Sequence, residues 1–183
     1  MNNHQIDSIL RHILGESFGG VFASDLLPSK IDKRPCFLVV NTHDHTREGE
    51  HWVGIILEDG EDRRSNFFDS YGHEPDFLFY PDFFINFLTA NSSEIRYNKL
   101  PVQDNDSAAC GAHVIFFLCQ RFKGFSFQEV MRMYSDNFKK NDAYVTKFVK
   151  TCAKCVLDVK TAKSSSQKAC TLKLFKNCYE CSK

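Results

Sequence analysis

The sequence of 183 residues predicts an α+β fold, in which a central, mostly antiparallel sheet is flanked by helices. Short apolar runs bounded by turn signals fill the first half of the chain, whereas helical periodicity dominates the C-terminal third. The hydrophobic fraction of 43%, which includes 18 Phe, supports one packed core, and the length suits one domain.

An N-terminal helix is expected because apolar residues follow the helical period from Ile6 to Leu14. Asn3 is its expected cap and Gly15 its expected end. Residues 17–35 contain glycines and prolines at several positions and are expected to be irregular.

Strands are expected at 36–40, 51–57, 66–69 and 95–97. A polar loop, 41–50, separates the first two. The Asp59-Gly60 turn predicts that 51–57 and 66–69 pair as an antiparallel hairpin.

Helices are expected from Pro81 to Leu88, from 110 to 122, from the Ser126/Glu129 capping box to Met133, and from about 141 to 155. The segment 110–122 is apolar nearly all round, which predicts a buried helix, with a strand as the alternative because of its Val, Ile and Phe content. We assign residues 1–158 to the domain and 159–183 to a basic C-terminal tail that contains Lys and Cys.

The composition argues against membrane insertion and secretion. No apolar run approaches the roughly 20 residues of a membrane span, and the N-terminus lacks a basic region followed by an apolar stretch. We therefore expect an intracellular, reducing environment, in which the 8 cysteines need not form disulfides. We also expect a monomer.

One cysteine stands in a setting that suits a nucleophile. Cys110 lies between the small residues Ala109 and Gly111, directly ahead of the longest apolar run of the chain. At the N-terminus of a helix, the helix dipole and free backbone N–H groups would favour its thiolate. Its small neighbours would let a substrate carbonyl approach. Cys36, Cys119 and Cys170 lack such a setting and are expected to be inert.

Three further residues complete a candidate catalytic site. His51 begins an apolar strand, and Asp69 ends its predicted partner strand, so the carboxylate can orient the imidazole at one edge of the sheet. Gln103, seven positions before Cys110, offers an amide N–H to an oxyanion. The candidate catalytic residues are therefore His51, Asp69, Gln103 and Cys110, and no metal is required for their chemistry.

These motifs together resemble the adenovirus protease family, the adenains. The resemblance rests on His51-Trp52, on Phe67-Phe68-Asp69-Ser70-Tyr71-Gly72, and on Gln103 followed by Ser107-Ala108-Ala109-Cys110-Gly111, and it covers roughly residues 15–135. That family shares its fold with the proteases specific for ubiquitin-like proteins such as SUMO. The glutamine spacing and the Ala-Ala pair match adenains, whereas Asp69 in place of Glu matches the deconjugating enzymes.

The resemblance implies a cysteine endopeptidase that cleaves capsid or core precursor proteins after small residues such as Gly. Such an enzyme would come from a DNA virus or a virus-derived element and, if viral, would act in the host nucleus and the virion. The alternative is a protease that processes or deconjugates ubiquitin-like proteins of the SUMO or NEDD8 type. Adenains are activated by DNA and by a peptide tethered through a cysteine. Because the matching position here is Ser92, no tethered peptide is expected there.

Competing interpretations are weaker. A chymotrypsin-like viral protease would need strands after the nucleophile, and a papain-like enzyme places its cysteine first. A binding module that had lost activity would lack a catalytic group, yet all are present here. The spacing of Cys152, Cys155, Cys178 and Cys181 is close to that of a zinc ribbon. The alternative is that these cysteines have no metal-binding role and lie in a Lys-rich tail. A His43/His45/His51 metal cluster is less favoured, and His113 is expected to be packed.

The charge distribution along the chain is uneven. Residues 139–183 carry 11 Lys and 3 acidic residues, a net charge of +8, whereas residues 1–138 carry −8. A basic tail on an acidic body is typical of nucleic-acid binding, so DNA is a candidate activator. A solvated tail that keeps the protein soluble explains the same charges equally well.

If the tail binds DNA, the affinity of the full chain for a DNA duplex will fall steeply as salt rises, because each Lys–phosphate contact releases condensed counterions. Fluorescence anisotropy with a labelled duplex over a series of KCl concentrations measures this slope. An affinity that does not change with salt would contradict electrostatic binding.

Overall fold

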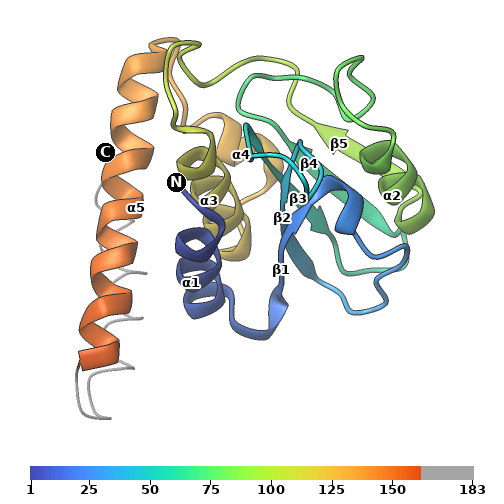
Figure 1. Cartoon of the computed structure of the whole chain (residues 1–183), viewed down its shortest axis with the longest axis horizontal. Helices are drawn as coiled ribbons and strands as arrows, with labels where there is room; N and C mark the ends of the chain where they lie inside the picture. Colours follow the sequence, from blue (N-terminus) through green and yellow to red (C-terminus); the bar gives the residue numbers. More distant parts are fainter. Residues whose placement is uncertain (162–183) are drawn as a thin grey trace.

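The structure is a computed structural model that describes residues 1–161. It is an α+β fold with a five-stranded sheet, whose strands lie in the order β1-β2-β3-β4-β5 (Figure 1). The strands are β1 (Phe18–Ala23), β2 (Cys36–Asn41), β3 (Trp52–Leu57), β4 (Arg64–Phe68) and β5 (Glu94–Tyr97). The predicted strands in the regions 36–40, 51–57, 66–69 and 95–97 are thus confirmed, with small shifts at their ends.

The expectation of a mostly antiparallel sheet was wrong, because the sheet is mixed. The β2–β3 and β3–β4 pairs are antiparallel, but β1 pairs with β2 in parallel and β4 pairs with β5 in parallel. Parallel neighbours need a crossover connection, and between β4 and β5 it carries helix α2 (Phe83–Asn91). The parallel direction of β5 relative to β4 therefore follows from the segment that connects them and not from the residue pattern of the strands.

Strand β1 was missed because its glycines were interpreted as loop residues. A Cβ atom at Gly19 would come within 2.4 Å of Leu38 Cδ2 and 2.7 Å of Cys36 Sγ, so only glycine lets β1 approach β2 this closely. The register also shifts between Phe18 and Gly20, which marks a bulge. Gly19 and Gly20 are therefore strand residues and not loop residues.

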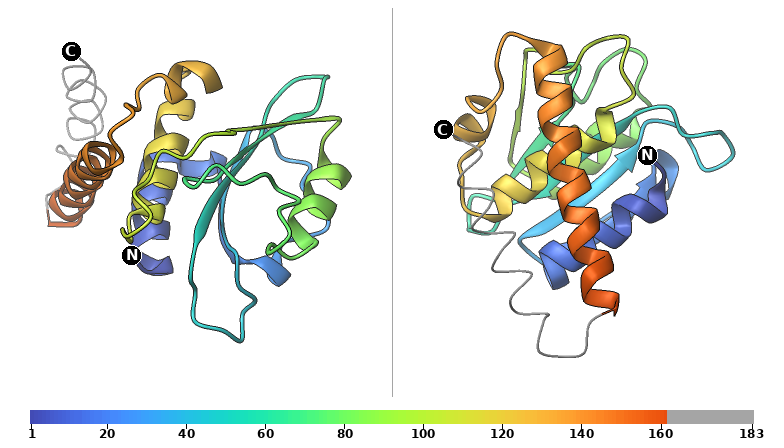
Figure 2. Two further views of the ribbon diagram at one scale, coloured as in Figure 1. Left: turned by 90° about the horizontal axis from the view of Figure 1, so that it is seen from above. Right: turned by 90° about the vertical axis from the view of Figure 1, so that its left-hand side faces the viewer.

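Helices cover both faces of the sheet. α1 (Asn3–Leu14) and α3 (Cys110–Phe122) pack on one face with α5 (Phe138–Thr161) outside them, and α2 covers the other face (Figures 1 and 2). Alternate residues of β2 enter the two cores: Phe37 and Val39 join the α1/α3 core, whereas Leu38 and Val40 join the α2 core. Both cores are rich in Phe.

The helices follow the sequence patterns closely, with differences at their ends. α3 begins at Cys110 and ends at Phe122, which confirms the buried helix, and α4 (Phe127–Met131) has the predicted capping box from Ser126 to Glu129. α1 is capped by Asn2 instead of Asn3 and ends before Gly15. α5 is longer than predicted and continues past residue 158. None of the helices in residues 1–161 is long and apolar enough to cross a membrane.

Packing between α3 and β4 is predicted to dominate stability near the site. Phe117 is fully buried and stacks on Phe68 with ring centroids 4.4 Å apart. Phe117→Ala should lower the free energy of unfolding by about 3–5 kcal/mol, because it removes this contact and leaves a cavity. Urea unfolding followed by circular dichroism measures the loss.

The matched control is Phe79→Ala, which truncates a ring that is 81% exposed and should change stability by less than about 0.5 kcal/mol. Equal effects of the two substitutions would contradict the packing described here.

Candidate active site

The structure brings His51, Asp69 and Cys110 together at one end of the β3–β4 pair. His51 immediately precedes β3 and Asp69 immediately follows β4. In the antiparallel register Gly54 lies opposite Phe68, so the start of β3 lies beside the end of β4. Cys110 is the first residue of α3, a helix that packs against β3. The three side chains therefore converge because of strand pairing and helix packing.

The imidazole of His51 is held by a fully buried carboxylate. His51 Nε2 lies 2.6 Å from Asp69 Oδ1, and Asp69 has no exposed surface. Burial would raise the pKa of Asp69, but the hydrogen bond and charge of His51 outweigh it, together with the Tyr71 backbone N–H and the Tyr80 hydroxyl. The pKa of Asp69 is consequently lowered, and the group stays ionised.

The thiol of Cys110 lines the same pocket as His51, which lowers its pKa. Burial raises the pKa of the Cys110 thiol, but the hydrogen bond and charge of His51 reverse this, and the N–H groups of Trp52 and Gly111 add to the effect. The net pKa of Cys110 is lowered. Burial likewise opposes the charged form of His51, yet Asp69 and Cys110 raise its pKa to about 9. Each partner therefore stabilises the charged form of the other, thiolate for Cys110 and imidazolium for His51.

Gln103 is buried near these residues, and both ends of its side-chain amide form hydrogen bonds within the protein. Its Oε1 accepts a hydrogen bond of 2.6 Å from Ser70 Oγ. Its Nε2 donates to the Ser107 carbonyl at 2.8 Å and to the Tyr71 hydroxyl at 3.1 Å. The predicted oxyanion donor is thus near the cysteine, but its two amide hydrogens are already used.

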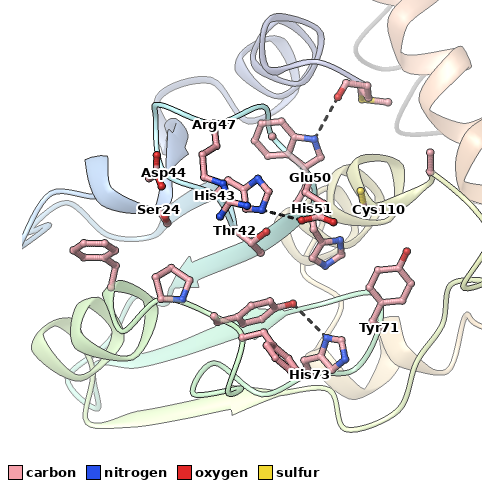
Figure 3. Close-up of a pocket in the computed structure, with 18 of the residues that line it drawn as sticks. Ser24, Thr42, His43, Asp44, Arg47, Glu50, His51, Tyr71, His73 and Cys110 are labelled. Atoms are coloured by element: carbon pink, nitrogen blue, oxygen red, sulfur yellow. Dashed lines mark hydrogen bonds and ion pairs between the residues drawn. The ribbon is translucent and has the colours of Figure 1, made fainter.

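The side chains of His51 and Cys110 line a pocket of about 770 Å³ (Figure 3). One wall is the loop after β2, with His43, Arg47 and Glu50, and the other is the segment from Tyr71 to Phe83. Ser107 and Ala108 border the pocket next to Cys110. A solvent-open cleft lined by Cys110 can admit an extended chain or a small ester.

Sequence reasoning missed several residues that hold the site. The Tyr80 hydroxyl donates to Asp69 Oδ2 at 2.8 Å, and His73 approaches the same oxygen at 2.9 Å. The Asn98 side chain bonds both the N–H and the carbonyl of the Asp69 backbone. His73 lies four residues after Asp69, which is a usable signal, but nothing local points to Tyr80 or Asn98.

The histidines of the candidate His43/His45/His51 cluster do not converge on one point. His43 Nε2 lies 2.8 Å from Glu50 and His45 Nδ1 lies 2.6 Å from Asp25, so the histidines of this loop take separate partners. Within residues 1–161 no group of three or more His, Cys, Asp or Glu is placed to hold a metal. Cys152 and Cys155 lie on α5, whereas Cys178 and Cys181 lie outside the described residues.

The remaining rival groups are packed. His113 is fully buried, bonds Asp142 at 2.8 Å and does not line the pocket. Cys36 and Cys119 are buried, and burial raises the pKa of Cys36. The pKa of Cys110, the cysteine at the cleft, is instead lowered.

Comparisons with known proteins give the fold and little else. Neither the comparison with protein-family models nor that with curated proteins gives a match. Among solved structures, the chain is similar to the central domain of the uncharacterized protein Lpg1148 from Legionella pneumophila, with a TM-score of 0.54 and 14% sequence identity. The similarity covers 86% of this chain and 98% of that domain. At this identity it supports the arrangement of the elements alone.

The coupled pair predicts an unusual pH profile for alkylation of Cys110 by iodoacetamide. Since protonated His51 stabilises the thiolate, the rate should stay high as the pH falls below the ordinary thiol value of 9.0 and drop only at the lowered pKa. His51→Ala should move this inflection upward, because burial alone then acts on the thiol.

Alkylation of Cys110 is measured by mass spectrometry across the pH range, with Cys110→Ala protein giving the background from other cysteines. An inflection at the same pH in the parent and in His51→Ala would contradict the ion pair.

Proposed function

We propose that this chain is a cysteine endopeptidase of the adenain and ubiquitin-like-protease type. The observation that carries the proposal is the His51–Asp69 hydrogen bond beside Cys110, with His51 and Cys110 both lining one open cleft. A thiolate, an imidazolium and a buried orienting carboxylate are the groups that acyl transfer to sulfur requires. The motifs that resemble adenains contain these same residues.

In the first half of the proposed reaction, Cys110 Sγ attacks the carbonyl carbon of the scissile amide and a C–S bond forms. The carbonyl π electrons move to the oxygen, which becomes an oxyanion. As the C=O bond re-forms, the C–N bond breaks and the leaving nitrogen takes the proton of His51. The products of this half are a thioester on Cys110 and a free amine.

In the second half, neutral His51 removes a proton from water, which attacks the thioester. The C–S bond breaks after a second oxyanion, and the sulfur leaves as thiolate beside the newly protonated imidazole. Asp69 remains ionised throughout. Its role is to hold the ring with Nε2 toward the carboxylate, which leaves Nδ1 for the sulfur.

The oxyanion needs donors on the Cys110 side of the cleft. The backbone N–H of Cys110 belongs to the first turn of α3, where N–H groups have no partner within the helix. Gln103 is the second candidate donor, and removing such a donor typically slows turnover by about 10²–10³-fold. We therefore expect Gln103→Ala to reduce turnover by that amount.

We propose protein precursors cleaved after small residues such as Gly as the substrates, following the resemblance to adenains. The alternative is the C-terminal tail of a ubiquitin-like protein. DNA is proposed as an activator that contacts the basic C-terminal region, which begins on α5 with Lys139 and Lys140. Ser92, at the end of α2, offers no thiol for a tethered peptide.

The central test is cleavage of Gly-containing peptides and of a ubiquitin-like precursor, followed by mass spectrometry of the products. The parent protein should cleave one of the two classes, and Cys110→Ala should abolish cleavage because no nucleophile remains. Cys155→Ala, which removes a thiol on α5, should leave the rate unchanged.

Undiminished cleavage by Cys110→Ala would contradict the assignment of the nucleophile. Cleavage of the precursor but not of the peptides would select the deconjugating alternative.

A further inference from the structure

The amide of Gln103 lies behind the wall of the cleft. Gln103 has no exposed surface and does not line the pocket. Both hydrogens of its Nε2 are committed, one to the Ser107 carbonyl and one to the Tyr71 hydroxyl. For Nε2 to reach an oxyanion directly, one of these two hydrogen bonds would have to break, which leaves a polar group in the protein interior without its partner.

Tyr71 lies between that amide and the pocket. Its side chain lines the pocket together with Cys110 and Ser107. Its ring stacks on His51, with centroids 4.9 Å apart and ring planes inclined by 29°. In Figure 3 the Tyr71 ring lies beside His51 with its hydroxyl toward the Cys110 side of the pocket.

The Tyr71 hydroxyl has a hydrogen to give. Its oxygen accepts from Gln103 Nε2 at 3.1 Å, and within residues 1–161 no hydrogen bond donated by this hydroxyl is formed. Burial raises the pKa of Tyr71, and the negative charges of Cys110 and Asp69 raise it further. The hydroxyl of Tyr71 therefore stays protonated at neutral pH.

We propose that Tyr71 is a catalytic residue whose hydroxyl donates a hydrogen bond to the oxyanion, and that Gln103 is a positioning residue that acts through it. The proposal rests on the proposed acyl-transfer function and deepens it. The Gln103 N–H orients and polarises the Tyr71 hydroxyl. This hydroxyl then donates a hydrogen bond to the substrate oxygen on which negative charge develops. Hydrogen bonds in such chains strengthen one another.

Tyr71 transfers no proton in the proposed reaction. When Cys110 Sγ bonds to the carbonyl carbon, the π pair moves to oxygen, and this oxygen is held by the Tyr71 O–H and the Cys110 N–H. Tyr71 keeps its proton. When the C=O bond re-forms, the leaving group departs with the proton of His51 if it is an amine, and without a proton if it is a stable phenolate.

Two reactions of Cys110 separate this role from a structural one. Alkylation by iodoacetamide needs the thiolate but forms no oxyanion, whereas acylation by p-nitrophenyl acetate forms one and requires no specific peptide. Tyr71→Phe keeps the ring and its stacking on His51. It should therefore leave alkylation little changed and slow acylation by about 10²-fold, the loss typical of one missing oxyanion donor.

The matched control is Tyr97→Phe, which removes a tyrosine hydroxyl that bonds Glu74 outside the pocket and should change neither rate. Gln103→Ala should also slow acylation. Because Gln103 acts through Tyr71, the double variant should be no slower than Tyr71→Phe alone, which is a strongly non-additive result.

The outcomes against the proposal are distinct. Acylation by Tyr71→Phe at the parent rate, with a loss confined to Gln103→Ala, would mean that Gln103 donates directly. If Tyr71→Phe slowed alkylation and acylation equally, the role of Tyr71 would be to position His51 and not to bind the oxyanion. If the parent is acylated by the ester but cleaves no peptide or precursor, the endopeptidase function fails while the Tyr71 comparison still stands. A parent that is not acylated at all overturns both.

Discussion

The site depends on one buried charge, the carboxylate of Asp69. With no exposed surface, it is stable as an anion only because Tyr71 N–H, His73 N–H, the Tyr80 hydroxyl and His51 all donate to it. This charge raises the pKa of His51, and the imidazolium in turn lowers the pKa of Cys110. The nucleophile is thus activated by a chain of hydrogen bonds that begins in the protein interior.

Much of this arrangement follows from patterns along the sequence. The limits of α3 and the position of Cys110 at its first residue come from a continuous apolar run that starts after small residues. His51 and Asp69 were predicted as neighbours because an Asp-Gly turn closes an antiparallel hairpin, and such hairpins bring the start of one strand beside the end of the next.

Other parts could not be predicted because their causes are tertiary. The glycines of β1 are required by contact with Leu38 and Cys36, which a local pattern does not reveal. Likewise, Asn98 reaches Asp69 from 29 residues away and Tyr80 from 11, and the local sequence around neither residue indicates a carboxylate partner. The four candidate catalytic residues were identified from side-chain chemistry, whereas the residues that hold them depend on packing.

The segment from Asp69 to His73 links the acid to the oxyanion side of the cleft. Ser70 accepts a backbone hydrogen bond from Val102 and donates its hydroxyl to Gln103, so the turn after β4 and the segment before α3 are tied together. Gly72, at φ +77, lets this turn lie against Leu100, where a Cβ would meet backbone at 2.6 Å. Since Tyr71 sits between these two anchors, its hydroxyl is held before any substrate arrives, and a donor placed in advance costs no reorganisation when charge develops.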